Sequence, residues 1–272
     1  MSDLAGPGMS AKPAFSAIEV RDLQKSYGHV QALRGASLEV SSREVVALVG
    51  DNGAGKSTLL KCICGAVVPD AGEVLVNGVA IAGAGSGSPS DHGIGVVYQD
   101  LALAPHLSVL ENVFLGHEVL RPGWRRRLGV LERRSMADRA DESLRRLGIA
   151  LPTTSLPVSL LSGGQRQAVA IARAVMWAKG AILLDEPTAA LGARQTKIVC
   201  DLVRAVADQG TAVLMISHDI TRIREFADRI VVMRQGGISA EFRADVATVA
   251  GIVQAMLEDS QHAEIGVAGR RA

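Results

Sequence analysis

A glycine-rich loop that carries a lysine and two hydroxyl groups is the segment best suited to chemistry. It fits the pattern G-x-x-x-x-G-K-[ST] and lies between an apolar run at 44–49 and a helical pattern from 58 onward. Glycines let successive N–H groups turn toward phosphate oxygens, where a lysine and a helix N-terminus add positive charge. We predict a nucleoside triphosphate site and keep a plain glycine turn as the alternative. The assigned residues are Gly50, Asp51, Asn52, Gly53, Ala54, Gly55, Lys56, Ser57 and Thr58.

Two adjacent carboxylates end a second apolar run, Ala-Ile-Leu-Leu-Asp-Glu-Pro at 181–187. Ligands of open α/β sheets bind at the carboxyl ends of the strands, so both acids would face the same site as the loop. We predict that Asp185 holds Mg²⁺ together with Ser57, and that Glu186 acts as general base toward the attacking water. An acidic strand end leading into a turn at Pro187 is the alternative.

Composition narrows the class of protein. The chain has 272 residues, of which 48% are hydrophobic and 3% aromatic, and its net charge is +1. These values favour one domain with a subdomain and disfavour a nucleic-acid partner. The longest apolar stretch, 168–184, is interrupted by Arg173, Lys179 and Gly180, so we expect no membrane-spanning helix. We also expect no signal peptide, since the first 15 residues hold no apolar run. We expect neither a disulfide framework nor a zinc site, since the cysteine count is odd and no histidine cluster lies nearby.

Apolar runs predict a mixed α/β fold. The early runs pair as antiparallel strands around the Asn77-Gly78 turn, whereas the later ones are continuous, as in parallel strands that are buried on both faces. We predict flexible ends at 1–16 and 260–272 and one domain at 17–259. The predicted strands include 18–20, 38–40, 45–49, 72–78, 94–98, 181–185, 212–217 and 230–233.

Helical spacing predicts a helical subdomain at about 101–165, inserted into the sheet domain. Within it we predict an N-cap at Ser135 and a buried face formed by Met136, Ala140, Leu144 and Leu147.

Two further stretches have weaker patterns. The segment Arg121–Arg134 holds six arginines, and we favour a solvated connector over a nucleic-acid or lipid contact. A stripe near the C-terminus predicts ordinary packing on the sheet. Its members are Val246, Val249, Val253, Met256 and Leu257.

The stretch Leu-Ser-Gly-Gly-Gln-Arg-Gln at 161–167 resembles the signature of the ATP-binding subunits of ABC transporters. With the phosphate loop it is very specific, and the resemblance runs from about Ile18 to about Leu257. It implies a P-loop NTPase core and a head-to-tail dimer in which ATP lies between the loop of one subunit and the signature of the other. The signature residues that would contact ATP are Ser162, Gly163, Gly164 and Gln165.

The resemblance also implies roles for three single residues. Tyr27 would stack on adenine, Gln99 would contact Mg²⁺ and water and sense the membrane partner, and His218 would contact the γ-phosphate. The implied catalytic set is therefore Glu186, His218, Lys56 and Gln99. Each of these residues also has a structural alternative when taken alone: Tyr27 as a surface aromatic, Gln99 as a polar loop residue and His218 as a helix cap. One departure is Gly192, where the family commonly has an acid, so we expect backbone groups to link the two ATP sites there.

The finer resemblance is to ATPases of bacterial ribose, xylose and fructose importers, through residues 185–196 and 107–112. It implies an ATPase on the cytoplasmic side of the cell membrane, with a permease as direct partner and a solute-binding protein as indirect one. We expect a groove near 99–117 to receive the permease, lined by Leu101, Leu103, Leu107 and Val109. An exporter ATPase, a non-sugar importer and a soluble ABC ATPase acting on ribosomes or DNA remain alternatives.

Overall fold

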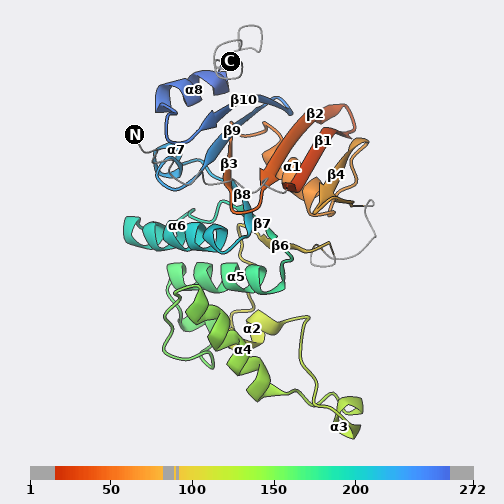
Figure 1. The fold of residues 1–272 in the computed structure, drawn as a ribbon, viewed down its shortest axis with the longest axis vertical. Helices are drawn as coiled ribbons and strands as arrows, with labels where there is room; N and C mark the ends of the chain where they lie inside the picture. Colours follow the sequence, from red (N-terminus) through yellow and green to blue (C-terminus); the bar gives the residue numbers. More distant parts are fainter. Residues whose placement is uncertain (1–15, 82–88, 90–91, 258–272) are drawn as a thin grey trace, which may run out of the picture.

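Two sheets and a set of helices make up the computed structural model, which describes residues 16–81, 89 and 92–257 (Figure 1). The predicted flexible ends lie outside the described residues, except Ser16, which begins the first strand. The antiparallel sheet has the order β2-β1-β4-β5. Its strands are β1 (Ser16–Tyr27), β2 (Val30–Ser41), β4 (Ala71–Val76) and β5 (Val79–Ala80).

The second sheet has the order β10-β9-β3-β8-β7-β6, and all its neighbouring pairs are parallel except β10 with β9. The predicted combination of a mostly parallel sheet and an antiparallel N-terminal sheet is confirmed. Edge strand β10 had no sequence-based prediction, because its side chains are at best half-buried and show no continuous apolar run. The strands are β3 (Val45–Val49), β6 (Ile94–Val97), β7 (Ala181–Asp185), β8 (Ala212–Ile216), β9 (Arg229–Arg234) and β10 (Gly237–Arg243).

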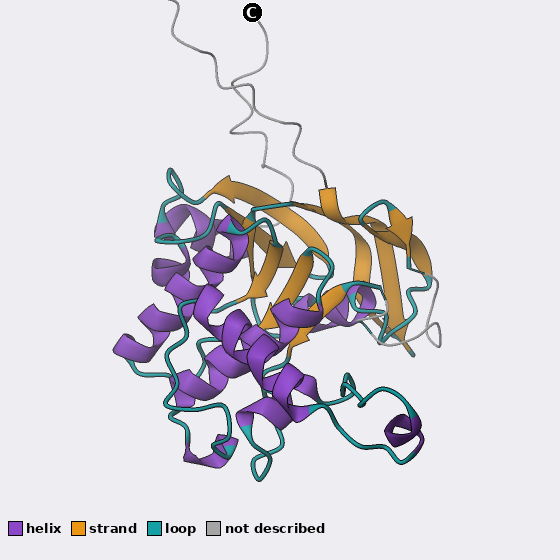
Figure 2. Cartoon of the chain, turned by 60° about the horizontal axis from the view of Figure 1, so that its bottom comes forward, coloured by secondary structure: helices purple, strands orange, loops and turns teal. Residues whose placement is uncertain are grey.

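Helices flank the parallel sheet and extend away from it on one side (Figures 1 and 2). No helix in the described part of the chain has the length and hydropathy needed to cross a bilayer. The helices are α1 (Lys56–Ile63), α2 (Val109–Phe114), α3 (Trp124–Arg127), α4 (Arg133–Arg146), α5 (Gly163–Trp177), α6 (Ala193–Asp208), α7 (Ile220–Ile223) and α8 (Val249–Leu257), with a 3₁₀ turn at Val158–Leu160.

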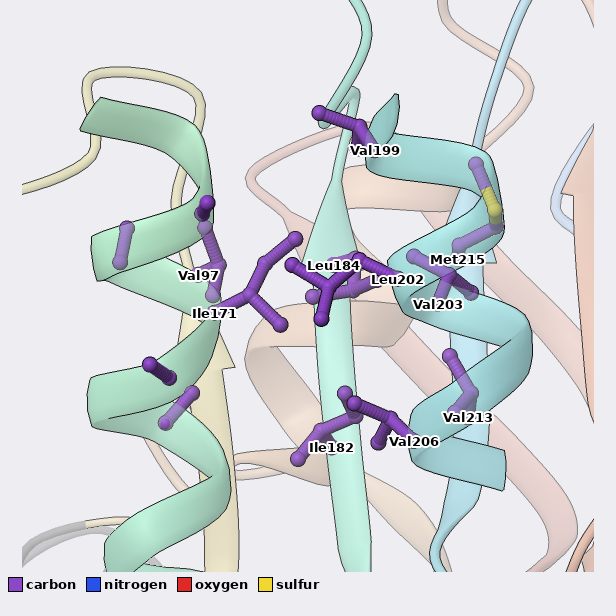
Figure 3. Packing of buried hydrophobic residues seen from close by; sticks show 14 of the residues in the cluster. Val97, Ile171, Ile182, Leu184, Val199, Leu202, Val203, Val206, Val213 and Met215 are labelled. Carbon is purple, nitrogen blue, oxygen red and sulfur yellow. The ribbon is translucent and has the colours of Figure 1, made fainter. Parts of the chain in front are cut away.

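Both faces of the parallel sheet are covered, which explains its continuous apolar strands. Along β3, Val45, Ala47 and Val49 join the core under α5 and α6, whereas Val46 and Leu48 join the core shared with α1 and the antiparallel sheet. Figure 3 shows side chains of α5 and α6 meeting those of β7. This packing fixes the strand ends that carry the chemistry.

Some local predictions were wrong, and each has a structural reason. Helix α4 begins at Arg133 with Glu132 at its N-cap, so Ser135 lies inside the helix. The predicted buried face of α4, which includes Met136 and Ala140, is confirmed. Val109 is fully buried in the core and cannot line a groove.

The C-terminal helix packs on the sheet as predicted, but most of the predicted stripe does not make that contact. Val246 and Leu257 are exposed, and of the residues in α8 only Ile252 is buried. The helix packs against β9, β10 and α7 through Ile252 and its partly buried neighbours, so the spacing identified the helix but not its buried side.

Candidate nucleotide-binding and hydrolysis site

Four neighbouring parallel strands deliver the predicted catalytic groups to one edge of the sheet. The phosphate loop follows β3, and His218 comes shortly after β8. Asp185 is the last residue of β7, Glu186 is the next residue, and Gln99 comes shortly after β6. The strands lie in the order β3-β8-β7-β6, and neighbouring strands are about 4.8 Å apart, so the groups form a row along the edge. Residues from four separate parts of the sequence are thereby brought together.

The phosphate loop needs its glycines for conformation and for space. Gly50, Gly53 and Gly55 have φ values of 153°, 82° and 107°, which side-chain-bearing residues rarely adopt. A Cβ on Gly50 would lie 2.1 Å from the carbonyl oxygen of Met233, and one on Gly55 would lie 2.5 Å from that of Ala32. Neighbouring strands therefore hold the loop closely from outside.

Lys56 is the first residue of α1 and its side chain turns back over the loop. Its Nζ donates hydrogen bonds to the carbonyl oxygens of Gly50 at 2.7 Å and Asp51 at 2.9 Å. Burial lowers the pKa of Lys56, and the charges of Glu186 and Asp51 partly oppose this. The ammonium thus lies inside the loop, bonded to loop carbonyl oxygens, and Ser57 is exposed beside it.

Glu186 directly contacts His218. His218 Nε2 lies 2.7 Å from Glu186 Oε1, which joins the groups after β7 and β8. Glu186 has a left-handed φ of 50°, and its N–H donates to the carbonyl oxygen of Ile216, so the backbone of β8 holds the residue in an uncommon conformation. A carboxylate and an imidazole in contact can exchange or share a proton, which suits general-base chemistry.

A cleft of about 250 Å³ opens beside this pair. Its lining comes from the segments after β7 and β8, from the first turns of α6 and from α7, and includes Thr188, Leu191 and Arg222. Asp185 lies at the strand end next to Glu186, and burial, followed by the neighbouring charge of Glu186, raises its pKa. Two carboxylates close together in a partly buried place favour a cation nearby.

The loop after Gln99 is held by two side chains that the sequence analysis did not assign. Arg173 of α5 donates to the carbonyl oxygens of Leu101 and Ala102 at 2.9 and 2.7 Å, and both of those residues have left-handed φ values. Asn112 is fully buried and bonds the backbone of the same loop at Ala104. Gln99 itself is exposed. An arginine amid the alanines and valines of α5 is the sequence signal that could have indicated such a role.

Tyr27 ends β1 in the other sheet and is half exposed. Lys25 Nζ lies 5.7 Å from the centre of its ring. The paired strand β2 reaches the phosphate loop through Ala32, whose carbonyl oxygen lies against Gly55. An exposed ring near that contact is compatible with adenine stacking.

The signature residues form the start of α5. Ser162 is the exposed N-cap: its Oγ accepts from Gln165 N–H, and its own N–H donates to Gln165 Oε1, as predicted for a capped helix. A Cβ on Gly164 would lie 3.2 Å from the side chain of Gln195, so this glycine also allows α5 to approach α6 closely. Figure 1 shows α5 away from α1, on the other side of the parallel sheet.

The departure at Gly192 has a structural meaning. Gly192 is the N-cap of α6, a place where an acid would accept hydrogen bonds from the first turn, and a Cβ there would meet nothing within 4 Å. Gly192 therefore leaves the first N–H groups of α6 without a side-chain cap.

Comparison with known proteins agrees with this geometry. The family model described as ABC transporter matches residues 33–189. The chain belongs to the ABC transporter family. The fold agrees as well, because an ATP-binding cassette of an ABC transporter in its ADP conformation superposes with a TM-score of 0.73 at 26% identity, covering 89% of this chain and 94% of that one.

Curated relatives of this ABC ATP-binding domain carry sugar import names. The chain is 42% identical to the xylose/arabinose import ATP-binding protein of Sulfolobus acidocaldarius, over 88% of this chain and 93% of that protein. It is 41% identical to the fructose import ATP-binding protein of Rhizobium meliloti, over 84% and 87%. The ribose import ATP-binding protein of Yersinia pestis is 39% identical, but the match spans only 42% of its length.

Proposed function

We propose that this chain is the ATP-hydrolysing subunit of an importer of monosaccharides. The observation that carries the proposal is the row of phosphate loop, His218, Glu186 and Gln99 along one sheet edge. The import names of the xylose/arabinose, fructose and ribose relatives support the class of solute. Membership of the ABC family supports ATP as the nucleotide.

The residues at the edge have separate tasks in this proposal. The loop N–H groups and Lys56 bind the phosphates, and Lys56 moves from the carbonyl oxygens of Gly50 and Asp51 to phosphate oxygens. Glu186 takes the proton of the attacking water while the bond between the γ-phosphorus and ADP breaks, giving ADP and inorganic phosphate. His218 leaves its contact with Glu186 to donate to the γ-phosphate.

The oxygen donors at this edge fit Mg²⁺. Ser57 is exposed at the first turn of α1, and Asp185 is a carboxylate whose raised pKa reflects burial and a neighbouring acid. Hydroxyl, carboxylate and amide oxygens are the ligands that Mg²⁺ prefers, so Ser57, Asp185 and Gln99 would hold it. When bound, the ion neutralises phosphate charge.

A second ATPase subunit completes the site in this proposal. The start of α5 lies away from α1 of its own chain, and its N-cap Ser162 is exposed, so the Ser162 hydroxyl is available to the γ-phosphate bound by a partner (Figure 1). A dimeric cassette bound to ADP and Pi, 28% identical with a TM-score of 0.68 over 84% of this chain and 98% of that one, supports pairing.

The remaining partners follow from import. A permease would contact the segment near 99–117, where Leu101, Leu103 and Leu107 are partly buried, and a solute-binding protein would act through that permease. The subunit would be peripheral, on the cytoplasmic side of the cell membrane.

The proposal is tested by reconstituting the chain with its permease in vesicles. We expect ATP hydrolysis to rise when a binding protein loaded with xylose, arabinose, ribose or fructose is added, and the empty binding protein to serve as control. If a binding protein loaded with another class of solute stimulates hydrolysis, the chain serves an importer of that solute. If the complex exports solute without needing a loaded binding protein, the chain serves an exporter. Failure of the purified chain to bind Mg·ATP would reject the whole proposal.

A further inference from the structure

The arginine-rich segment, for which we predicted a solvated connector, folds as a hairpin. We call residues 119–132 the arginine hairpin. A bridge pairs Leu120 with Leu131, and backbone bonds run from Arg121 N–H to the carbonyl oxygen of Val130 at 2.8 Å and from Glu132 N–H to that of Val119 at 2.7 Å. The short helix α3 forms its tip. The hairpin is therefore a built structure.

The arginine hairpin projects from the molecule. Figure 1 places α3 at the end of the long axis opposite α8, and Figure 2 shows the same tip separated from the other helices. A surface that projects in this way can contact a partner without disturbing the sheet edge that carries the nucleotide site.

Some arginines around the hairpin are paired and others are not. Arg121 pairs with Glu132 at 3.2 Å, and Arg133 with Glu111 at 3.1 Å. Arg126, Arg127 and Arg134 are exposed, and the described part of the chain offers them no carboxylate within ion-pair distance. The tip and base of the hairpin therefore have free positive charge although the whole chain has a net charge of only +1.

Apolar side chains are exposed beside these arginines. Leu128 follows Arg127 directly and is 67% exposed, and Val130 is 37% exposed. Leucine and arginine together suit a bilayer interface, where the guanidinium lies among headgroups and the apolar side chain lies deeper. An RNA backbone would satisfy the arginines but would leave Leu128 in water.

We propose that the arginine hairpin binds the anionic phospholipid headgroups of the bilayer. The inference rests on the proposed function in one respect, that the subunit works beside a membrane. Each arginine near an anionic surface strengthens binding about fivefold. Such contacts alone are weak and reversible, so the hairpin would add to the attachment that the permease provides.

The test is co-sedimentation of the full chain with lipid vesicles. Vesicles of phosphatidylcholine alone are compared with vesicles that also contain phosphatidylglycerol, at low and at physiological salt. We expect binding only to the anionic vesicles, with a decrease as salt rises. The double variant Arg126→Glu/Arg127→Glu should bind at least about 20-fold more weakly, since two attractions become repulsions.

Two further variants separate the hairpin from general charge. Arg145→Glu/Lys197→Glu changes the net charge equally on exposed parts of α4 and α6 and should bind nearly as well as the unaltered chain. Leu128→Ser should weaken binding about fivefold while leaving all charges in place.

The proposal is overturned if the unaltered chain ignores anionic vesicles, if both double variants lose binding equally, or if RNA binds and displaces the vesicles completely. ATP hydrolysis is measured on the same samples. Normal hydrolysis without lipid binding rejects the hairpin proposal alone, whereas lipid binding without any hydrolysis rejects the proposed function alone.

Discussion

The two surfaces that would enclose one ATP are built in different ways. The sheet edge gathers its groups from strands whose backbones are hydrogen-bonded to one another, so the loop and the Glu186–His218 pair are fixed by the core. The start of α5 offers only a capped helix terminus, with exposed Ser162, on a helix that also holds the Gln99 loop through Arg173. In the proposed function the edge binds phosphate by itself, whereas the helix terminus acts only when another surface approaches it.

This difference suggests a division of work. Chemistry needs atoms placed to a fraction of an ångström, which a buried parallel sheet provides. Closure needs a second surface to approach the first, and the exposed Ser162 at the start of α5 is placed for such an approach. Variants on each side should therefore fail in different assays.

Glu186→Gln tests the sheet edge and should have the largest effect. The amide keeps the shape but cannot accept the proton of water, so turnover should fall at least ~10²-fold while ATP binding remains. Stopped-flow or phosphate-release assays measure the loss. Glu225→Gln, an exposed residue after α7, is the matched control. Turnover near the normal value would remove Glu186 from the role of base.

Ser162→Asp tests the helix terminus. Aspartate caps helices as well as serine does, so α5 should stay folded, but its carboxylate would repel a phosphate and cannot donate to it. We expect ATP-dependent dimerisation to weaken about 10- to 100-fold, while the monomer binds ATP normally. Light scattering with and without ATP gives the measurement, and Ser162→Thr should behave like the unaltered chain. Unchanged pairing would contradict a shared site.

Arg173→Met tests the link between the two surfaces. Its two hydrogen bonds hold Leu101 and Ala102 in left-handed conformations, so we expect the free energy of unfolding to fall by about 2 kcal/mol. Hydrogen exchange at 100–104 should quicken while the phosphate loop is unchanged. Arg173→Lys should show an intermediate loss. Equal loosening of both regions would mean that the arginine supports the fold in general.

Gly192→Asp should have the smallest effect. An acid at the N-cap of α6 has space and would accept hydrogen bonds from the first turn, raising the free energy of unfolding by a few tenths of a kcal/mol. Chemical denaturation measures the free energy of unfolding of this variant and of Gly210→Ala. Because Gly210 has a φ of 111°, which disfavours a side chain, Gly210→Ala should lower that free energy whereas Gly192→Asp raises it. A large change in turnover instead would give this position a role between the two sites.

Sequence predicted the fold well where the hydrophobic pattern was strong. The continuous run before the phosphate loop and the run ending at Asp185 both form internal strands of the parallel sheet. Prediction failed where local signals were ambiguous. Ser135 has the right type for a cap, but the N-cap is Glu132, three residues earlier. The stripe at the C-terminus marks a helix whose one fully buried residue is Ile252. Residue types alone leave a helix boundary uncertain by a few residues, because tertiary packing decides where the helix begins and which side of it is buried.

By itself the sequence determined the chemistry of the site. Glycines that permit left-handed turns, a lysine at a helix start and carboxylates at a strand end carry their function in residue type and spacing. Tertiary structure alone decided which of them touch. It paired Glu186 with His218, turned Lys56 onto the carbonyl oxygen of Gly50 and tied Arg173 to the loop after Gln99, because strand order and helix packing act between residues far apart in the chain.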